Sequence, residues 1–236
     1  MIKLLFILLQ FQINNYLSEI FLRNTFEIHI ASKKQTAFLI EHKSINYLVT
    51  ARHIFLDKPV RTEFKLFNSQ AQNNLENYSG TVFYNDNPSV DLVLIKPTGI
   101  PYRKAITLEN TVNILGDSGY FLGFPFDFKT ITSGNFNLGY PIPLVKKATY
   151  SGVALDNNVS YVLLDGINNP GFSGGPIIFR SSDGKKQELI GVIGGYFTFQ
   201  TNYTNDSGGS VTLPNNSGII FGTRTKHILE ILEKFK

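Results

Sequence analysis

The sequence predicts an all-β fold, either a sandwich or a pair of barrels, with one C-terminal helix. Many short runs are rich in β-branched and aromatic residues, and turn residues separate them. The 236 residues include 20 Phe and 11 Tyr, and 42% are hydrophobic, which is enough for a sizeable core. This rhythm argues against alternating β and α units. The strand-like runs are FEIHIA, TAFLIEH, INYLVTA, EFKLFN, GTVFYN, VDLVLIK, GYFLGF, YVLLDG, GPIIF and ELIGVIGGYF.

Three further segments predict local structure in the second half of the chain. The turn residues Ser181 to Gly184 lie between two strand-like runs and predict an antiparallel hairpin. The Asn- and Gly-rich stretch from Thr201 to Gly218 is typical of an exposed loop. The last residues, TRTKHILEILEKFK, have apolar side chains at helical spacing and predict an amphipathic helix packed on the barrels.

Residues 1–22 form an N-terminal extension, with two interpretations. The apolar run from Leu4 to Leu9 resembles a short signal-peptide core, but Gln10 and Gln12 interrupt it and no small-x-small cleavage site follows. We therefore favour a structural segment in a cytoplasmic protein over export. No other run approaches the roughly 20 apolar residues of a membrane span.

Composition excludes several classes of function. The chain has 22 Lys+Arg and 18 Asp+Glu, and its net charge of +4 is spread without a basic block, so no nucleic-acid partner is expected. The absence of Cys excludes disulfides, thiolate metal sites and a cysteine nucleophile. The histidines lack metal-ligand spacing, so we expect neither a metal nor a cofactor. His29, His42 and His227 are expected to face solvent.

Ser173 lies in the segment NNPGFSGGPIIF and is the candidate nucleophile. A catalytic serine needs a base, a group that orients the base, and donors for the developing oxyanion. The segment also fits Gly-x-Ser-x-Gly, the nucleophile elbow of α/β-hydrolases, which requires a helix after the serine and a later histidine. A β-like run follows instead, and the later histidine, His227, lies in the terminal helix. The α/β-hydrolase interpretation therefore fails.

The order His, Asp, Ser fits better. His53 follows the apolar run YLVTA, and Asp91 begins the run DLVLIK. The separations, 91 − 53 = 38 and 173 − 91 = 82 residues, leave room for the other strands of two barrels. Each residue alone has a structural explanation as a turn, a cap or a half-buried histidine. The three together favour a catalytic triad.

Three segments together resemble the signature motifs of trypsin-like serine proteases: Thr50–His53, Asp91–Leu94 and Gly171–Pro176. The resemblance covers roughly Thr36 to Leu229 and is greatest to the cysteine-free bacterial branch, which includes the high-temperature-requirement proteases. It implies two packed six-stranded antiparallel β-barrels within a peptidase domain of residues 23–236. Barrel one would cover about 23–112, barrel two about 113–222 and the C-terminal helix about 223–236. The active site would lie between the barrels.

The same resemblance assigns roles to site residues. Ser173 would attack a peptide carbonyl, His53 would take its proton, and Asp91 would orient the imidazole. The backbone N–H groups of Gly171 and Ser173 would form the oxyanion hole. The implied activity is that of a serine endopeptidase acting on polypeptides through an acyl-enzyme, without a cofactor.

The resemblance also places the substrate-binding residues. Ile167, six residues before the serine, would lie at the floor of the primary specificity pocket. The strand Gly194, Gly195 and Tyr196 would form a wall and pair with the substrate backbone. An apolar floor predicts an apolar residue before the cleaved bond. Asp165 would reverse this preference if it lined the pocket instead.

Two departures from the family pattern matter. Phe172 stands where digestive trypsin-like enzymes carry an Asp that pairs with a newly cut N-terminus, so activation by that ion pair is not expected. The rival hypothesis is a protease-shaped binding module that is latent until an activating partner binds. The segment from Gln35 to Phe38 also differs from the bacterial pattern, and we expect this to affect packing more than chemistry.

Overall fold

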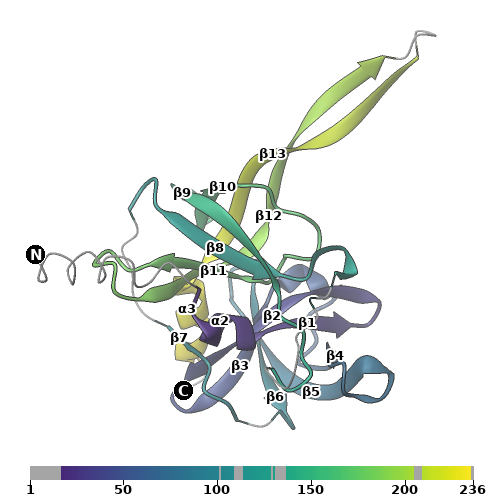
Figure 1. Ribbon diagram of the computed structural model, residues 1–236, viewed down its shortest axis with the longest axis vertical. Helices are drawn as coiled ribbons and strands as arrows, with labels where there is room; N and C mark the ends of the chain where they lie inside the picture. The colour runs from purple at the N-terminus through teal and green to yellow at the C-terminus, as the bar shows by residue number, and fades with distance from the viewer. Residues whose placement is uncertain are drawn as a thin grey trace, which may run out of the picture.

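The computed structural model describes residues 17–100, 102–108, 114–128, 130, 137–204 and 209–234. Within these residues the all-β prediction is confirmed (Figure 1). Most of the N-terminal extension, including the signal-like run, lies outside the described residues, but its end forms the short helix α2 (Glu19–Arg23). Part of the segment between the proposed barrels, 109–113, also lies outside them. No helix in the described ranges has the length and apolar character needed to span a membrane.

Six antiparallel strands form the first barrel. They pair in the order β1-β4-β5-β6-β3-β2, and β1 also pairs with β2, which closes the ring. The two-residue strand β7 (Ile106–Thr107) adds to β2 in parallel. The six strands are β1 (Thr25–Ile30), β2 (Lys33–His42), β3 (Ile45–Thr50), β4 (Arg61–Phe67), β5 (Leu75–Tyr84) and β6 (Val93–Thr98).

The second barrel is also closed and antiparallel. Its strand order is β10-β13-β12-β11-β8-β9. The predicted hairpin at Ser181–Gly184 is confirmed, because β11 and β12 pair from Arg180 and Gln187 onward. The strands are β8 (Ser118–Gly123), β9 (Leu144–Asp156), β10 (Val159–Asp165), β11 (Pro176–Arg180), β12 (Gln187–Thr204) and β13 (Ser210–Arg224).

Strand periodicity divides the core into three parts. In β2, Ala37 and Leu39 point into the first barrel, whereas Phe38 and Ile40 join a cluster shared with the second barrel and the C-terminal helix. That helix, α3 (Lys226–Lys234), confirms the prediction of a C-terminal helix and contributes apolar side chains to the shared cluster. The shared cluster fixes the two barrels against each other, which sets the position of any site between them.

The predicted loop from Thr201 to Gly218 is wrong. Strands β12 and β13 continue as a paired ribbon from Thr198 and Asn216 to Thr204 and Ser210, and the tip, 205–208, lies outside the described residues. Figure 1 shows this ribbon projecting far from the barrels. The Asn, Thr and Gly residues of this stretch are typical of loops, so its composition predicted a loop. Alternate residues nevertheless share one face, as Phe199, Thr201 and Tyr203 do, which is the period of a strand.

The expectation that His227 faces solvent is wrong, and His29 and His42 are only partly exposed. His227 is 2% exposed, its Nε2 accepts the backbone N–H of Ser160 at 3.0 Å, and its Nδ1 lies 2.8 Å from Glu230. His29 and His42 are half-buried, and His29 bonds to Glu27. Since Nε2 of His227 accepts, Nδ1 carries the proton and donates to Glu230. His227 therefore ties α3 to β10.

Replacing Glu230 by Gln should weaken this attachment in a pH-dependent way. Partial burial alone would raise the pKa of Glu230, but hydrogen bonds from His227 and Asn85 outweigh it and hold the pKa below its ordinary value. Such a carboxylate stabilises the fold fully above its unfolded pKa of about 4.3, and the stabilisation is lost as pH falls through the lower folded pKa. Glu230→Gln should therefore lower the melting temperature at neutral pH, with the deficit shrinking in acid. Glu233→Gln is the control on the same helix, and a deficit independent of pH would contradict this account.

Candidate active site

His53 lies in a short turn held in place by its neighbours. Strand β3 ends at Thr50, and the 3₁₀ turn η1 (Arg52–Ile54) follows, with Ile54 2% exposed in the core of the first barrel. Arg52 donates to the carbonyl of Pro88 at 2.5 Å, and its guanidinium lies 5.9 Å from the ring centre of Tyr84. These contacts attach the histidine turn to the segment that leads to Asp91.

Asp91 engages His53 with both carboxylate oxygens. The buried residues Val90 and Leu92 flank it and fix the backbone just before β6. Oδ1 accepts the backbone N–H of His53 at 3.0 Å, and Oδ2 lies 2.8 Å from Nδ1 of the ring. Because the carboxylate can only accept, Nδ1 carries the proton in the neutral ring and Nε2 remains free to accept one. The pair is arranged to act as an oriented general base.

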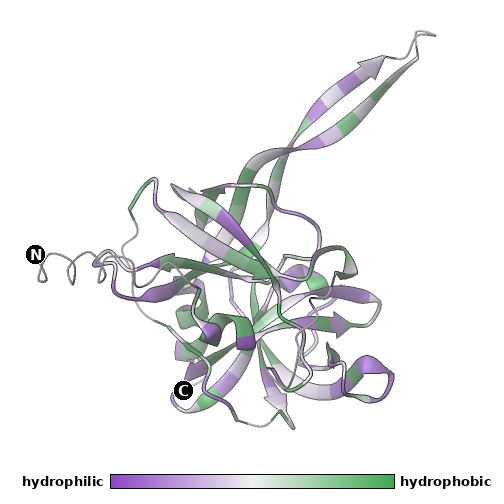
Figure 2. Ribbon diagram, in the orientation of Figure 1, coloured by the Kyte–Doolittle hydropathy of each residue, from purple (hydrophilic) through white to green (hydrophobic). Residues whose placement is uncertain are grey.

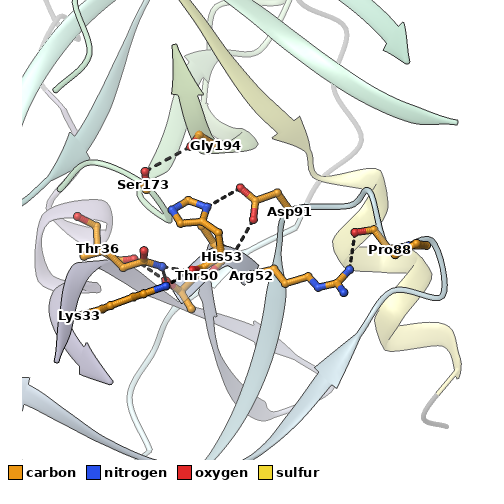
Figure 3. A network of polar contacts seen from close by, with 11 residues as sticks. Lys33, Thr36, Thr50, Arg52, His53, Pro88, Asp91, Ser173 and Gly194 are labelled. Carbon is orange, nitrogen blue, oxygen red and sulfur yellow. Dashed lines mark hydrogen bonds and ion pairs between the residues drawn. The ribbon is translucent and has the colours of Figure 1, made fainter. Parts of the chain in front are cut away.

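Ser173 lies on the second barrel, in the tight turn before β11. Figure 3 shows the imidazole of His53 between Asp91 and Ser173. The serine hydroxyl donates to the carbonyl of Gly194 at 3.3 Å. Within the described residues no hydrogen bond joins this hydroxyl to His53. Since this hydroxyl carries a single proton, it can donate to His53 only when it no longer donates to Gly194.

The turn before Ser173 contains a glycine in a left-handed conformation and two backbone donors that are unpaired in the part of the chain that the structure describes. Gly171 has φ +103°, and a Cβ there would lie 2.5 Å from the carbonyl oxygen of Phe124, so glycine is required. The backbone N–H groups of Gly171 and Ser173 have no hydrogen-bond partner among the described residues. Two unpaired donors beside the serine hydroxyl can stabilise a developing negative charge.

Phe172 holds this turn by apolar packing. Its side chain is fully buried in the core of the second barrel, with its ring centre 5.0 Å from that of Phe121 in an edge-to-face arrangement. The neighbouring N–H of Gly175 donates to the carbonyl of Phe172 at 2.9 Å. The aromatic ring therefore anchors the turn without an ion pair.

Thr36 on β2 is a positioning residue that the sequence did not reveal. Its hydroxyl donates to the carbonyl of Gly171 at 2.7 Å and accepts the N–H of Phe124 at 3.0 Å. Its backbone N–H donates to the carbonyl of Ser173 at 3.1 Å. A threonine in an apolar strand resembles an ordinary β-branched residue, so only the fold shows that it bridges the barrels at the serine turn.

The proposed substrate-binding residues are less closely grouped than the triad. Ile167 is 52% exposed, and its carbonyl accepts the ammonium of Lys146. Lys146 also lies 3.1 Å from Oδ1 of Asn169, and burial lowers its pKa. Asp165 is exposed at the end of β10. The Lys146 ammonium next to Ile167 places positive charge beside the proposed pocket.

Strand β12 passes close to the serine at its two glycines. A Cβ on Gly194 or Gly195 would lie 2.9 Å from the ring of Phe221, so both positions favour glycine. Tyr196 is half-buried and pairs with Ile220 of β13. Across the described ranges, no three His, Asp or Glu side chains are grouped to hold a metal ion.

The first barrel carries a histidine paired with a carboxylate, and the second carries a serine turn beside them. This arrangement defines a double-barrel serine hydrolase. The chain belongs to the family described as trypsin-like peptidase domain, whose family model matches residues 35–192. It is therefore a trypsin-like serine endopeptidase. No curated protein sequence matches the chain.

Solved structures share the fold at low sequence identity. The active form of the Rv3671c protease from M. tuberculosis is 15% identical, with TM-score 0.57, over 91% of this chain and 81% of that one. The serine endoprotease from Yersinia pestis is 19% identical, with TM-score 0.58, over 92% and 64%. The HtrA-type protease AlgW with tripeptide is 19% identical, with TM-score 0.57, over 92% and 61%. The chain thus spans less than two thirds of the latter two.

Replacing Thr36 by Val should disturb both stability and activity. The substitution keeps the shape but leaves the carbonyl of Gly171 and the N–H of Phe124 without this partner. We expect the free energy of unfolding to fall by about 1–3 kcal/mol. Hydrolysis of a peptide substrate should slow because the serine turn loses its support. Thr36→Ser keeps the hydroxyl and should retain most of the stability and activity. Urea denaturation measures the stability, and initial rates measure the activity. Equal behaviour of the Val and Ser variants would disprove the role of the hydroxyl.

Proposed function

We propose that the chain hydrolyses peptide bonds through a triad of His53, Asp91 and Ser173. The observation that supports this most directly is the double engagement of His53 by Asp91, at 2.8 and 3.0 Å, beside a serine on the other barrel. A buried structural histidine is expected to have hydrogen-bond partners for both ring nitrogens. His53 is instead half exposed, with 49% of its side chain accessible.

The positions of His53, Asp91 and Ser173 support the following mechanism. The Ser173 hydroxyl rotates from Gly194 toward Nε2 of His53, loses its proton to that nitrogen and forms a bond to the substrate carbonyl carbon. The N–H groups of Gly171 and Ser173 stabilise the oxyanion. Protonated His53 then delivers the proton to the leaving amine, and an acyl-enzyme remains. A water molecule then loses a proton to His53 and forms a bond to the acyl carbon. The bond to the Ser173 oxygen breaks, this oxygen takes the proton from His53, and the acid product leaves. No cofactor takes part.

The hydrogen bond from Ser173 to Gly194 favours one alternative, a latent form. In that form the nucleophile is engaged by a backbone carbonyl, and an activating partner or bound substrate would release it. The two hypotheses differ in one property, which is the reactivity of Ser173 in the isolated protein.

Labelling with a fluorophosphonate probe should occur at Ser173 in the wild type. Ser173→Ala should abolish labelling, and His53→Ala or Asp91→Ala should slow it about 10³-fold or more, because the base or its orientation is lost. Ser182→Ala, at an exposed position of the turn between β11 and β12, is the matched serine control. Mass spectrometry identifies the modified peptide. A folded wild type that is not labelled would support the latent module.

We further propose that the residue before the cleaved bond is apolar. Ile167 supplies no charge to pair with Lys or Arg, and the Lys146 ammonium beside it disfavours a second cation. A carboxylate in the pocket would favour a basic residue before the cleaved bond, and Asp165 is the candidate for that role. Asp165 lies at the end of β10, where its backbone pairs with Ile219 and Thr149.

A peptide library should therefore be cut after Leu, Val or Phe in preference to Arg. Ile167→Asp should raise the ratio of cleavage after Arg to cleavage after Leu by at least about tenfold, since a carboxylate at the floor pairs with the cation. Leu155→Asp, at an exposed position of β9, is the control for added charge. Cleavage after Arg alone by the wild type would refute the proposal.

A further inference from the structure

The projecting ribbon is an uncharged extension of the strand that passes the serine. We define the arm as residues Phe197–Thr204 of β12 and Ser210–Ser217 of β13, neither of which contains a charged residue. Figure 1 shows that it leaves the second barrel as two strands only. A two-stranded ribbon is at best marginally stable in water unless something covers or extends it.

The arm has one apolar face and one polar face. Residues paired directly across an antiparallel ribbon lie on the same face, and the pairs Thr201–Leu213 and Tyr203–Val211 define the apolar one. Figure 2 shows alternating bands of hydropathy along both strands. The apolar face carries side chains that are each about half exposed: Phe199 54%, Tyr203 51%, Val211 56% and Leu213 48%. The polar face carries Thr198, Gln200, Asn202 and Thr212.

The open edge of the arm is continuous with the edge that faces Ser173. Strand β12 pairs with β11 only up to Val192, whereas it pairs with β13 up to Thr204. Beyond Val192 no described strand pairs with the edge opposite β13. The carbonyl of Gly194 on this part of the strand accepts the Ser173 hydroxyl at 3.3 Å. A polypeptide lying along this edge would therefore run from the serine onto the arm.

An aromatic pocket lies where the arm leaves the barrel. The ring of Phe221 lies beneath Gly194 and Gly195, and the rings of Phe197 and Tyr161 have their centres 5.3 and 6.0 Å from it. A cavity of about 230 Å³ is lined by Ala154, Asp156, Tyr161, Leu163, Phe197 and Phe221. Aromatic rings thus lie under the strand from Gly194 to the base of the arm.

We propose that the arm binds the substrate segment preceding the cleaved bond, as a third antiparallel strand added to the open edge of β12. The segment is extended and uncharged, with apolar side chains at alternate positions beside Phe199 and Tyr203. Antiparallel pairing is the more stable arrangement, and it directs the C-terminal end of the added strand toward Ser173. Backbone hydrogen bonds and contacts with the apolar face are both needed for affinity, and the apolar face also supplies selectivity. This proposal rests on the proposed function of Ser173.

The test is peptide binding to the full-length Ser173→Ala protein, which does not require catalysis. A short fluorescent peptide begins a few residues before the apolar cleavage position, and a long one adds about eight uncharged, alternately apolar residues, enough to span the arm residue for residue. Fluorescence anisotropy should show at least about tenfold tighter binding of the long peptide, which corresponds to about 1.4 kcal/mol. N-methylation of alternate backbone amides in the added segment should remove the gain, because the edge hydrogen bonds are lost.

Matched variants assign the gain to the apolar face. Phe199→Ser with Leu213→Ser should bring the ratio of long to short binding close to one, whereas Gln200→Ser with Thr212→Ser, on the polar face of the same strands, should preserve it. Circular dichroism checks that both variants keep their β structure. Equal binding of the two peptides by the parent protein, or a gain that survives on the apolar-face variant, would overturn the proposal.

Two further outcomes separate this inference from its alternatives. If fluorophosphonate labelling of Ser173 fails but the long peptide still binds more tightly, the proposed function is wrong and the arm is still a polypeptide-binding edge. If sedimentation shows an oligomer that the apolar-face variant dissociates, while the long peptide has no advantage, the arm is an interface between copies of this chain and the proposal is overturned.

Discussion

The hydroxyl of Thr36 is the contact on which the geometry of the site depends. His53 and Asp91 belong to one barrel and Ser173 to the other. Their relative position therefore depends on the contacts between the two barrels. Thr36 lies on β2 and bonds to Gly171, Phe124 and Ser173 across that junction. Its own carbonyl accepts the hydroxyl of Thr50, the last residue of β3 before the histidine turn. Thr36 therefore relates both halves of the site, with its hydroxyl and backbone N–H on the serine side and its carbonyl on the histidine side.

The serine turn is held from its other side by apolar packing. Phe172 fills the core of the second barrel against Phe121, and Gly123 has no room for a Cβ because the Phe172 ring lies 2.6 Å from that position. Packing of this kind does not depend on pH or on a free N-terminus. The serine turn is thereby anchored without an ion pair, which suits a chain with Phe at position 172.

The sequence predicted the fold and the order of the candidate triad because both are carried by local patterns. Strand-length runs, turn residues and three short motifs each leave a signal within about ten residues. Thr36 and His227 leave none, and the arm leaves only a weak one. The role of Thr36 depends on a partner turn from the other barrel, and that of His227 on a backbone N–H of β10. The alternation that makes Thr201 to Gly218 an arm is carried by residues typical of loops, so composition outweighed pattern.

The open edge of the arm begins at Gly194 and Gly195 of β12. Glycine at both positions lets β12 lie directly on Phe221, which leaves the strand edge beside Ser173 unobstructed by side chains of its own. The same edge then continues outward for the length of the arm, whose residues have larger side chains but no charged ones. A cleft that recognised only one side chain would gain nothing from such an extension. An enzyme that selects extended, uncharged segments would gain affinity with each residue pair along the edge, since main-chain hydrogen bonds repeat with the strand period.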